Sequence, residues 1–229
     1  MKPLRTRGIT AALLAAVALT ACSNTNRGVV QPSPQPAIGG QSDVAAIAKA
    51  TADSARYPYT AADVHFMSGM ISHHAQAIVM AGWAPTHGAS ASVRRLTDRI
   101  INAQQDEIAT MQQWLADRRQ PVPEARPTGM KMMMNGVEHE MLMPGMLTKD
   151  QMKQLDQARG TEFDRLFLTF MIQHHKGAVA MVKEVFDSYG AGQDEIVFKF
   201  ASDVNVDQST EISRMEMMLA ALPPERGSP

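Results

Sequence analysis

Cysteine is almost absent from this sequence, since Cys22 is the only one among 229 residues. A single cysteine excludes an internal disulfide and a metal site built from several thiolates of one chain. Aromatic residues make up only 5% of the chain, and the net charge of -1 gives no bulk field that would attract nucleic acid. Phosphate loops, nucleotide fingerprints and nucleophile triads are also missing. We therefore expect no organic cofactor and no nucleic-acid partner, and no motif indicates an enzyme.

The N-terminal segment has the features of an export signal. A basic stretch with Lys2, Arg5 and Arg7 precedes an apolar run over 9–19 that is too short for a stable membrane-spanning helix. The run leads into Leu-Thr-Ala-Cys, ending at Cys22, which resembles a bacterial lipobox. We expect a lipoprotein signal peptide over 1–21 and lipidation of Cys22, which would anchor the protein to a membrane outside the cytoplasm. An ordinary signal peptide with an incidental cysteine is the alternative.

The segment after the lipobox is typical of a tether. Residues 23 to about 42 are rich in Pro, Gly, Ser, Gln and Asn, a composition found in flexible linkers. A short helix over 42–55 would complete the segment 22–56. No later stretch is apolar enough for a transmembrane helix, and residues 222–229 are expected to form a disordered tail.

Residues 57–221 have the apolar spacing of long helices. The first is expected to begin at Thr60, which forms a capping-box pattern with Asp63, and the second at Ser90. A third helical stretch from Thr148 is expected to run into the second His-His segment, and a last helix covers about 194–219. This organisation predicts a first helix pair over 57–119, a connection over 120–147 and a second pair over 148–221.

The two halves repeat the same residues. Nine positions between 60 and 80 carry the same residue 101 positions later, and His73-His74 returns in this way as His174-His175. The following helices repeat at a spacing of 104, with Gln104, Glu107, Ile108 and Met111 matching Gln208, Glu211, Ile212 and Met215. A single helix pair cannot bury its apolar face well, so the repeat predicts an all-α four-helix bundle with a long crossover.

The crossover over 120–147 holds seven of the 18 methionines. Its alternation around Val137–Met141 predicts a small hairpin that turns at Asn135-Gly136. Clustered methionines are easily oxidised outside the cell, so their density favours burial or capture of a soft metal. His139 lies within this cluster and would be an extra ligand, whereas His65 and His87 are expected at the surface.

Helical geometry indicates which side chains could share a site. Consecutive residues are about 100° apart, so the two histidines of a pair cannot point at the same spot. Imidazole with thioether favours copper, especially Cu(I), and Met rather than Glu precedes each pair at i-3, which argues against a carboxylate-rich di-iron site. The candidate ligands are Met70, His73, His74, Met80 and Glu107 in the first half, and Met171, His174, His175, Met181 and Glu211 in the second.

A structural interpretation of the same residues stays open. Methionines at helical spacing commonly fill cores, and a buried histidine can simply bond a glutamate across the bundle. Asp63 and Asp164 are expected to be helix caps rather than ligands. The leading hypothesis is copper buffering or transfer, which implies a metal-transfer protein partner. The alternative is a structural or interaction bundle whose His-Glu contacts only specify packing.

Taken together, the motifs resemble the domain of unknown function 305 family over roughly residues 57–221. The resemblance rests on segments 70–80, 143–147, 160–165 and 171–181, and on the Gln104, Glu107, Ile108 and Met111 pattern. It implies a ferritin-like four-helix bundle in an exported protein, with Met70, His73, His74, Met171, His174 and His175 as first candidates for copper ligands. Lys176 departs from the repeat, which has Ala75 at that position, so the halves are expected to differ in metal affinity.

Overall fold

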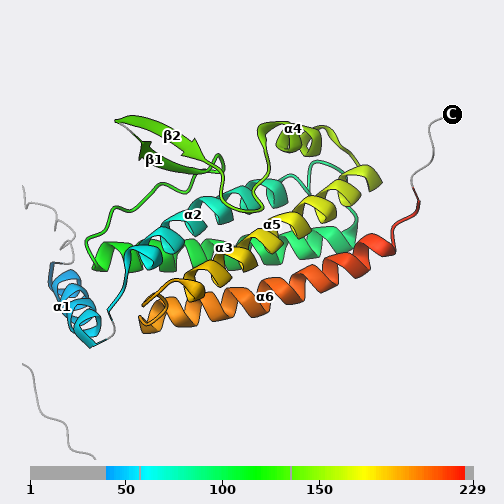
Figure 1. The fold of residues 1–229 in the computed structure, drawn as a ribbon. Coiled ribbons are helices and arrows are strands. Elements are labelled where there is room, and N and C mark those ends of the chain that lie inside the picture. Colours follow the sequence, from blue (N-terminus) through cyan, green and yellow to red (C-terminus); the bar gives the residue numbers. More distant parts are fainter. Residues whose placement is uncertain (1–39, 57, 135, 225–229) are drawn as a thin grey trace, which may run out of the picture. The chain divides into compact units, whose positions relative to one another are not determined.

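The computed structural model describes residues 40–56, 58–134 and 136–224. The expected signal peptide, Cys22 and most of the tether lie outside these ranges, as do residues 225–229 of the expected tail. The described part of the chain is mostly helical, with six helices and one two-stranded sheet (Figure 1). The predicted all-α class is therefore confirmed in its main feature. The helices are α1 (Gly40–Arg56), α2 (Ala61–Gly82), α3 (Ala91–Asp117), α4 (Lys149–Gln157), α5 (Thr161–Asp187) and α6 (Glu195–Ala220).

Local capping residues start the long helices where the sequence predicts. Asp63 accepts a hydrogen bond from the Thr60 backbone N–H at 2.7 Å, and the Thr60 hydroxyl accepts one from the Asp63 N–H, so α2 begins with a complete capping box. Ser90 caps α3 through the Val93 N–H, and Asp194 caps α6. These bonds satisfy N–H groups that a helix end leaves without partners.

The prediction of one continuous third helix is wrong. Its first part is the separate helix α4, which has its own capping box between Thr148 and Gln151. The chain then leaves the helix at Ala158 and reaches α5 through Gly160, whose φ of 60° is a conformation that favours glycine. Asp164 does not cap α5 either, and instead accepts the Ser90 N–H from the other hairpin at 3.1 Å.

The four long helices form two hairpins that contact each other through α2 and α5. Figure 1 shows α2 running opposite to α3, α5 opposite to α6, and α2 opposite to α5. Apolar side chains fill the contacts in two clusters, one around Phe66 and Trp114 and the other around Phe163 and Phe167. None of the helices in the described ranges is long and apolar enough to span a membrane.

The crossover leads from the end of α3 to the start of α5 at the far end of the helices (Figure 1). It contains the predicted hairpin, formed by β1 (Met130–Met134) and β2 (Val137–Met141) in antiparallel register, with Gly136 at φ 78° in the turn. The methionines whose side chains the structure describes divide into two groups. Met130, Met143 and Met146 are buried, whereas Met133 is exposed on the hairpin. The buried group holds the crossover against the helices.

Candidate metal centre

All four histidines of the repeated pairs are fully buried. His73 on α2 faces His174 on α5, with ring centroids 3.7 Å apart. Within each pair the rings diverge, because the centroids of His73 and His74 are 6.2 Å apart and those of His174 and His175 are 6.3 Å apart. The contact between α2 and α5 therefore brings one histidine of each pair together, as the angle between consecutive helix residues requires.

The other histidine of each pair faces a glutamate of its own hairpin. His74 Nε2 lies 2.6 Å from Glu107 Oε2 on α3, and His175 Nε2 lies 2.8 Å from Glu211 Oε2 on α6. Only the second contact has the alignment of a hydrogen bond, because the His74 N–H direction misses the carboxylate. The helical spacing predicts these contacts, while a role of the four residues as metal ligands stays a prediction.

Hydrogen bonding at Nε2 leaves Nδ1 of the same ring with the lone pair. The Pro144 carbonyl oxygen, 3.1 Å from His73 Nε2, can only accept, so His73 Nε2 carries the hydrogen. Among the described residues, Nδ1 of all four histidines is buried without a hydrogen-bond partner, and His174 Nε2 is also unpartnered. Metal-binding histidines commonly use this arrangement, with one nitrogen donating to a carbonyl or carboxylate and the other on the metal.

Burial keeps the inner histidines neutral. It lowers the pKa of both His73 and His174 well below the ordinary value, and the neighbouring imidazoles lower both pKa values further. Burial by itself raises the pKa of Glu211, but the His175 hydrogen bond and the charges of His175 and Arg99 outweigh it, so this pKa is lowered. Neutral imidazole is the form that binds a metal, so the protonation states match that use.

The donor atoms are of types that bind metals, but they are not arranged as a formed metal site. Among the residues described, no three His, Cys, Asp or Glu side chains converge as a ready metal-binding group. The His73 and His174 rings lie face to face with 38° between their planes, and the lone pair of an imidazole nitrogen lies in the ring plane. Coordination of one ion by both rings therefore requires rotation of at least one of them.

The predicted methionine ligands are buried but lie in different places. Met70 and Met181 belong to the apolar cluster around Phe66, whereas Met80 and Met171 belong to the cluster around Phe163. Met70, Met80 and Met171 are completely buried. Met181 lines a small cavity that reaches the surface. The repeat relates Met70 to Met171 and Met80 to Met181, and the structure puts one member of each pair in each cluster.

Sequence reasoning missed how the crossover covers the inner histidines. The Gln76 amide binds both polar backbone groups of Leu147. Its Oε1 accepts a hydrogen bond from the Leu147 N–H at 2.6 Å, and its Nε2 donates one to the Leu147 carbonyl oxygen at 3.1 Å. Gly177 lies under Pro144, whose carbonyl oxygen occupies the space that a Cβ would need. A glycine inside a long helix is a sequence signal for close backbone approach, and Gly177 offered that signal.

Two further histidines differ in their surroundings. His87, expected at the surface, is buried, because its Nε2 bonds the Asp156 carbonyl oxygen on α4 at 2.8 Å. The separation of α4 from α5 creates this contact, so the sequence interpretation of one long helix also missed it. His139 lies on the exposed strand β2, and His65 is exposed on α2.

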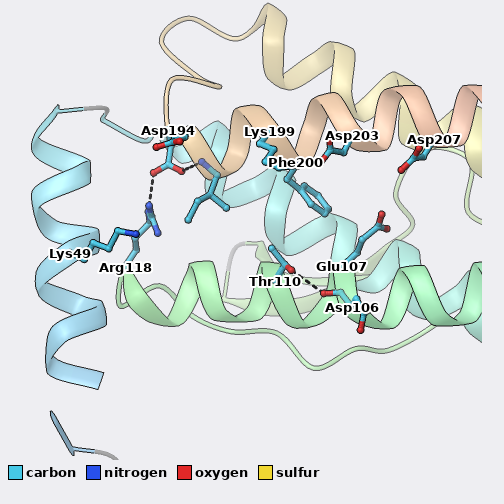
Figure 2. A pocket seen from close by; sticks show the side chains of 12 residues that line it. Lys49, Asp106, Glu107, Thr110, Arg118, Asp194, Lys199, Phe200, Asp203 and Asp207 are labelled. Atoms are coloured by element: carbon cyan, nitrogen blue, oxygen red, sulfur yellow. Dashed lines mark hydrogen bonds and ion pairs between the residues drawn. The ribbon is translucent and has the colours of Figure 1, made fainter. Parts of the chain in front are cut away.

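Cavities between α3 and α6 lead toward the glutamates. Figure 2 shows one of about 480 Å³, in which Glu107 points from α3 toward α6, where Asp203 and Asp207 also line the space. A second, of about 230 Å³, is lined by Glu107 and Glu211 together with Gln104 and Gln208. Oε1 of both glutamines is buried without a hydrogen-bond partner among the described residues. The polar side of the centre therefore has a route to solvent.

Comparisons with known proteins place this arrangement in a family. The family model described as a domain of unknown function (DUF305) matches residues 63–219. A DUF305 fragment from Deinococcus radiodurans is 28% identical, with 72% of this chain and 99% of that chain covered and a TM-score of 0.59. A DUF305 protein from Streptomyces coelicolor, described as secreted, is 27% identical, with 69% and 92% covered and a TM-score of 0.58.

Another similar protein has solved structures that are described as copper-bound. CopM in the Cu(II)-bound form is 28% identical, with 69% of this chain and 95% of that chain covered and a TM-score of 0.53. CopM in the Cu(I)-bound form is 26% identical, with a TM-score of 0.52. Among curated protein sequences, none matches this chain significantly.

Proposed function

Since this chain belongs to the DUF305 family, we propose that it is an extracytoplasmic, lipid-anchored protein that buffers copper or passes it on. The observation that carries the proposal is the set of four buried histidines, each with an unpartnered Nδ1. A buried polar atom without a partner is costly, so four such atoms on two facing histidine pairs favour a ligand that would bind them. The similarity to copper-bound CopM supports copper as that ligand.

The inner histidines are the first ligands in this proposal. His73 and His174 come from different hairpins, so a copper ion held by both would link the two halves of a ferritin-like bundle. His74 and His175 add imidazoles that Glu107 and Glu211 orient. Imidazole suits copper, and a thioether such as that of Met70, one turn before His73 on α2, would favour Cu(I) over harder ions. Lipidation at Cys22 and delivery to a metal-transfer protein partner complete the proposed role.

A Cu(I) titration against a competing chelator tests the proposal. The purified protein is expected to bind Cu(I) with a dissociation constant below about 1 µM. His174→Phe keeps a ring in place and removes only a weak contact with the His73 backbone, because neither nitrogen of His174 has a hydrogen-bond partner of good geometry. This variant is expected to lose affinity without losing its metal-free fold. Binding weaker than about 1 µM by the unaltered protein, or equal binding by His174→Phe, would refute copper binding at the inner histidines.

The second candidate is a structural or interaction bundle. Its support is that His74 and His175 each contact a glutamate of their own hairpin. In this case the histidines only specify how the helices pack, as buried polar networks can do. Metal that binds only the folded state raises stability, by about 2.7 kcal/mol when the free metal is 100 times the dissociation constant. A melting temperature that copper leaves unchanged would favour the structural role.

A further inference from the structure

A small cavity lies where the start of α2 meets the end of α5 under the crossover. It has a volume of about 50 Å³ and is lined by His65, Phe66, Met143, Pro144, Met181 and Glu184 among others. This space is large enough for an ion or a few water molecules, since one water needs about 10–15 Å³ by such a measure. The lining combines one imidazole with two thioethers, which are soft-metal ligands.

The cavity continues a line of positions on α2 that leads to the inner histidines. His65, Gly69 and His73 are four residues apart and therefore lie along one face of the helix. His65 is exposed at the outer end, and His73 is fully buried at the inner end. The Met143 segment reaches the same centre, because the carbonyl of the next residue, Pro144, accepts the His73 hydrogen bond.

Gly69 makes room for the two sulfur side chains. A Cβ added at Gly69 would lie 2.7 Å from Met143 Sδ and 3.4 Å from Met181 Cε. Both methionines are almost completely buried, and their contact with the Gly69 position places them beside the part of α2 between His65 and His73. Any other residue at position 69 would push the Met143 sulfur out of its place.

The second half of the repeat shows that helix packing does not require a histidine and a glycine at these positions. The positions 101 residues after His65 and Gly69 hold Leu166 and Phe170, which are apolar and bulky. Phe170 is buried there in the cluster around Phe163. The first half therefore has an open, sulfur-lined cavity where the second half has an apolar core.

We propose that His65, Met143 and Met181 form an entry site for Cu(I), from which the ion passes to His73 and His174. This inference rests on the proposed copper function. Two thioethers and one imidazole are neutral ligands, so the step is a ligand exchange in which the copper stays Cu(I) and no proton is released. Glu184 at the same cavity supplies a negative charge that attracts the cation.

Cu(I) titrations of His65→Ala and Met143→Leu test the entry site. Each is expected to weaken one class of Cu(I) binding by at least about tenfold, since even losing a residue that only orients a ligand commonly weakens metal binding about 10- to 100-fold. Met217→Leu is the matched control, because Met217 is exposed on α6. Gly69→Ala should act like Met143→Leu while keeping α2, since alanine favours helices more than glycine.

The outcomes separate this inference from the proposed function. If the unaltered protein binds no Cu(I), the copper function itself fails. If the unaltered protein binds Cu(I), the test is whether the variants differ from it. Equal affinity and an equal rate of Cu(I) uptake in His65→Ala and Met143→Leu would overturn only the entry site. Loss of binding in His139→Ala but not in His65→Ala would also overturn it, because entry would then occur at the β-hairpin. Metal-free melting curves of all variants check that the fold is intact.

Discussion

The two hairpins place the same His-Glu contact in different electrostatic surroundings. Glu211 accepts a hydrogen bond from His175 and forms an ion pair with Arg99 at 3.0 Å. Glu107 has the unaligned contact with His74, and the cavity beside it also holds Asp203. Asp203 lies 104 residues after Arg99, so the repeat carries opposite charges at this position. The repeat has kept the inward-facing residues, whereas Arg99 pairs with Glu211 and no lysine or arginine pairs with Glu107 among the described residues.

A second contrast concerns how each hairpin receives the crossover. Gln76 and Gly177 occupy matching positions, 101 residues apart. Gln76 binds the crossover backbone with its amide, whereas Gly177 has no side chain and lets the Pro144 carbonyl approach. One half therefore holds the crossover by hydrogen bonds, and the other half leaves space for it. The inner histidines lie beneath a segment that depends on both.

The largest expected difference between the hairpins lies at the starts of their second helices. Asp194 bonds Arg118 at 2.5 Å and Trp114 Nε1 at 3.0 Å in a buried site, whereas Ser90, its match in the first half, only caps α3. Asp194→Ala strands the Arg118 charge and should lower the free energy of unfolding by about 3–5 kcal/mol. Ser90→Ala should lower it by about 1 kcal/mol. Denaturant unfolding of both variants measures this difference, and equal losses would contradict it.

The contrast at the crossover predicts the next effect. In Gly177→Ala, the new Cβ collides with the Pro144 backbone, which cannot move as a flexible side chain can. We expect a loss of about 1–3 kcal/mol, as for other overpacked sites, even though alanine is the better helix former. Ala180→Gly on the exposed side of α5 is a control for helix propensity alone, with an expected loss of about 0.5–1 kcal/mol. An unchanged or raised stability of Gly177→Ala would show that the crossover is not tightly seated.

The inner pair should make the two hairpins alike in their response to acid. His73 and His174 have lowered pKa values when folded, so below about pH 6.5 the unfolded chain binds more protons and stability falls. Each histidine contributes up to about 1.4 kcal/mol per pH unit. The lowered pKa of Glu211 acts only at lower pH, below its ordinary value of 4.5.

Unfolding of the metal-free protein between pH 7 and about pH 5 measures this slope. His174→Phe removes one of the two groups and should reduce the slope by about half. His73→Phe should have a similar effect on the slope, although it also frees the Pro144 carbonyl. A slope that neither change reduces would mean that other groups control the acid response.

Local signals made part of this molecule predictable from sequence. Thr60, Ser90 and Asp194 are capping residues that act on N–H groups within a few positions, so the helix starts follow directly from them. The His-Glu contacts also follow, because helical periodicity sets which residues face the partner helix in a hairpin. Both rest on short-range geometry.

The remaining features depend on contacts between distant segments. The stacking of His73 on His174 requires the packing of α2 on α5, and the bond to Pro144 requires the path of the crossover. The burial of His87 depends on Asp156, which approaches only because Gly160 turns the chain. Periodicity within a single helix contains no information about these placements.

The smallest predicted difference concerns the two glutamates themselves. Glu211→Gln removes a charge that Arg99 and His175 stabilise and that is largely buried, so we expect a loss of about 1 kcal/mol in the free energy of unfolding. Glu107→Gln removes a more exposed charge that has no lysine or arginine partner among the described residues, so its loss should stay below about 0.5 kcal/mol. Denaturant unfolding of the two variants at pH 7 compares them. Because Arg99 favours only the Glu211 charge, Arg99→Gln should remove most of the difference, and a difference that persists would place its origin in the His-Glu geometry instead.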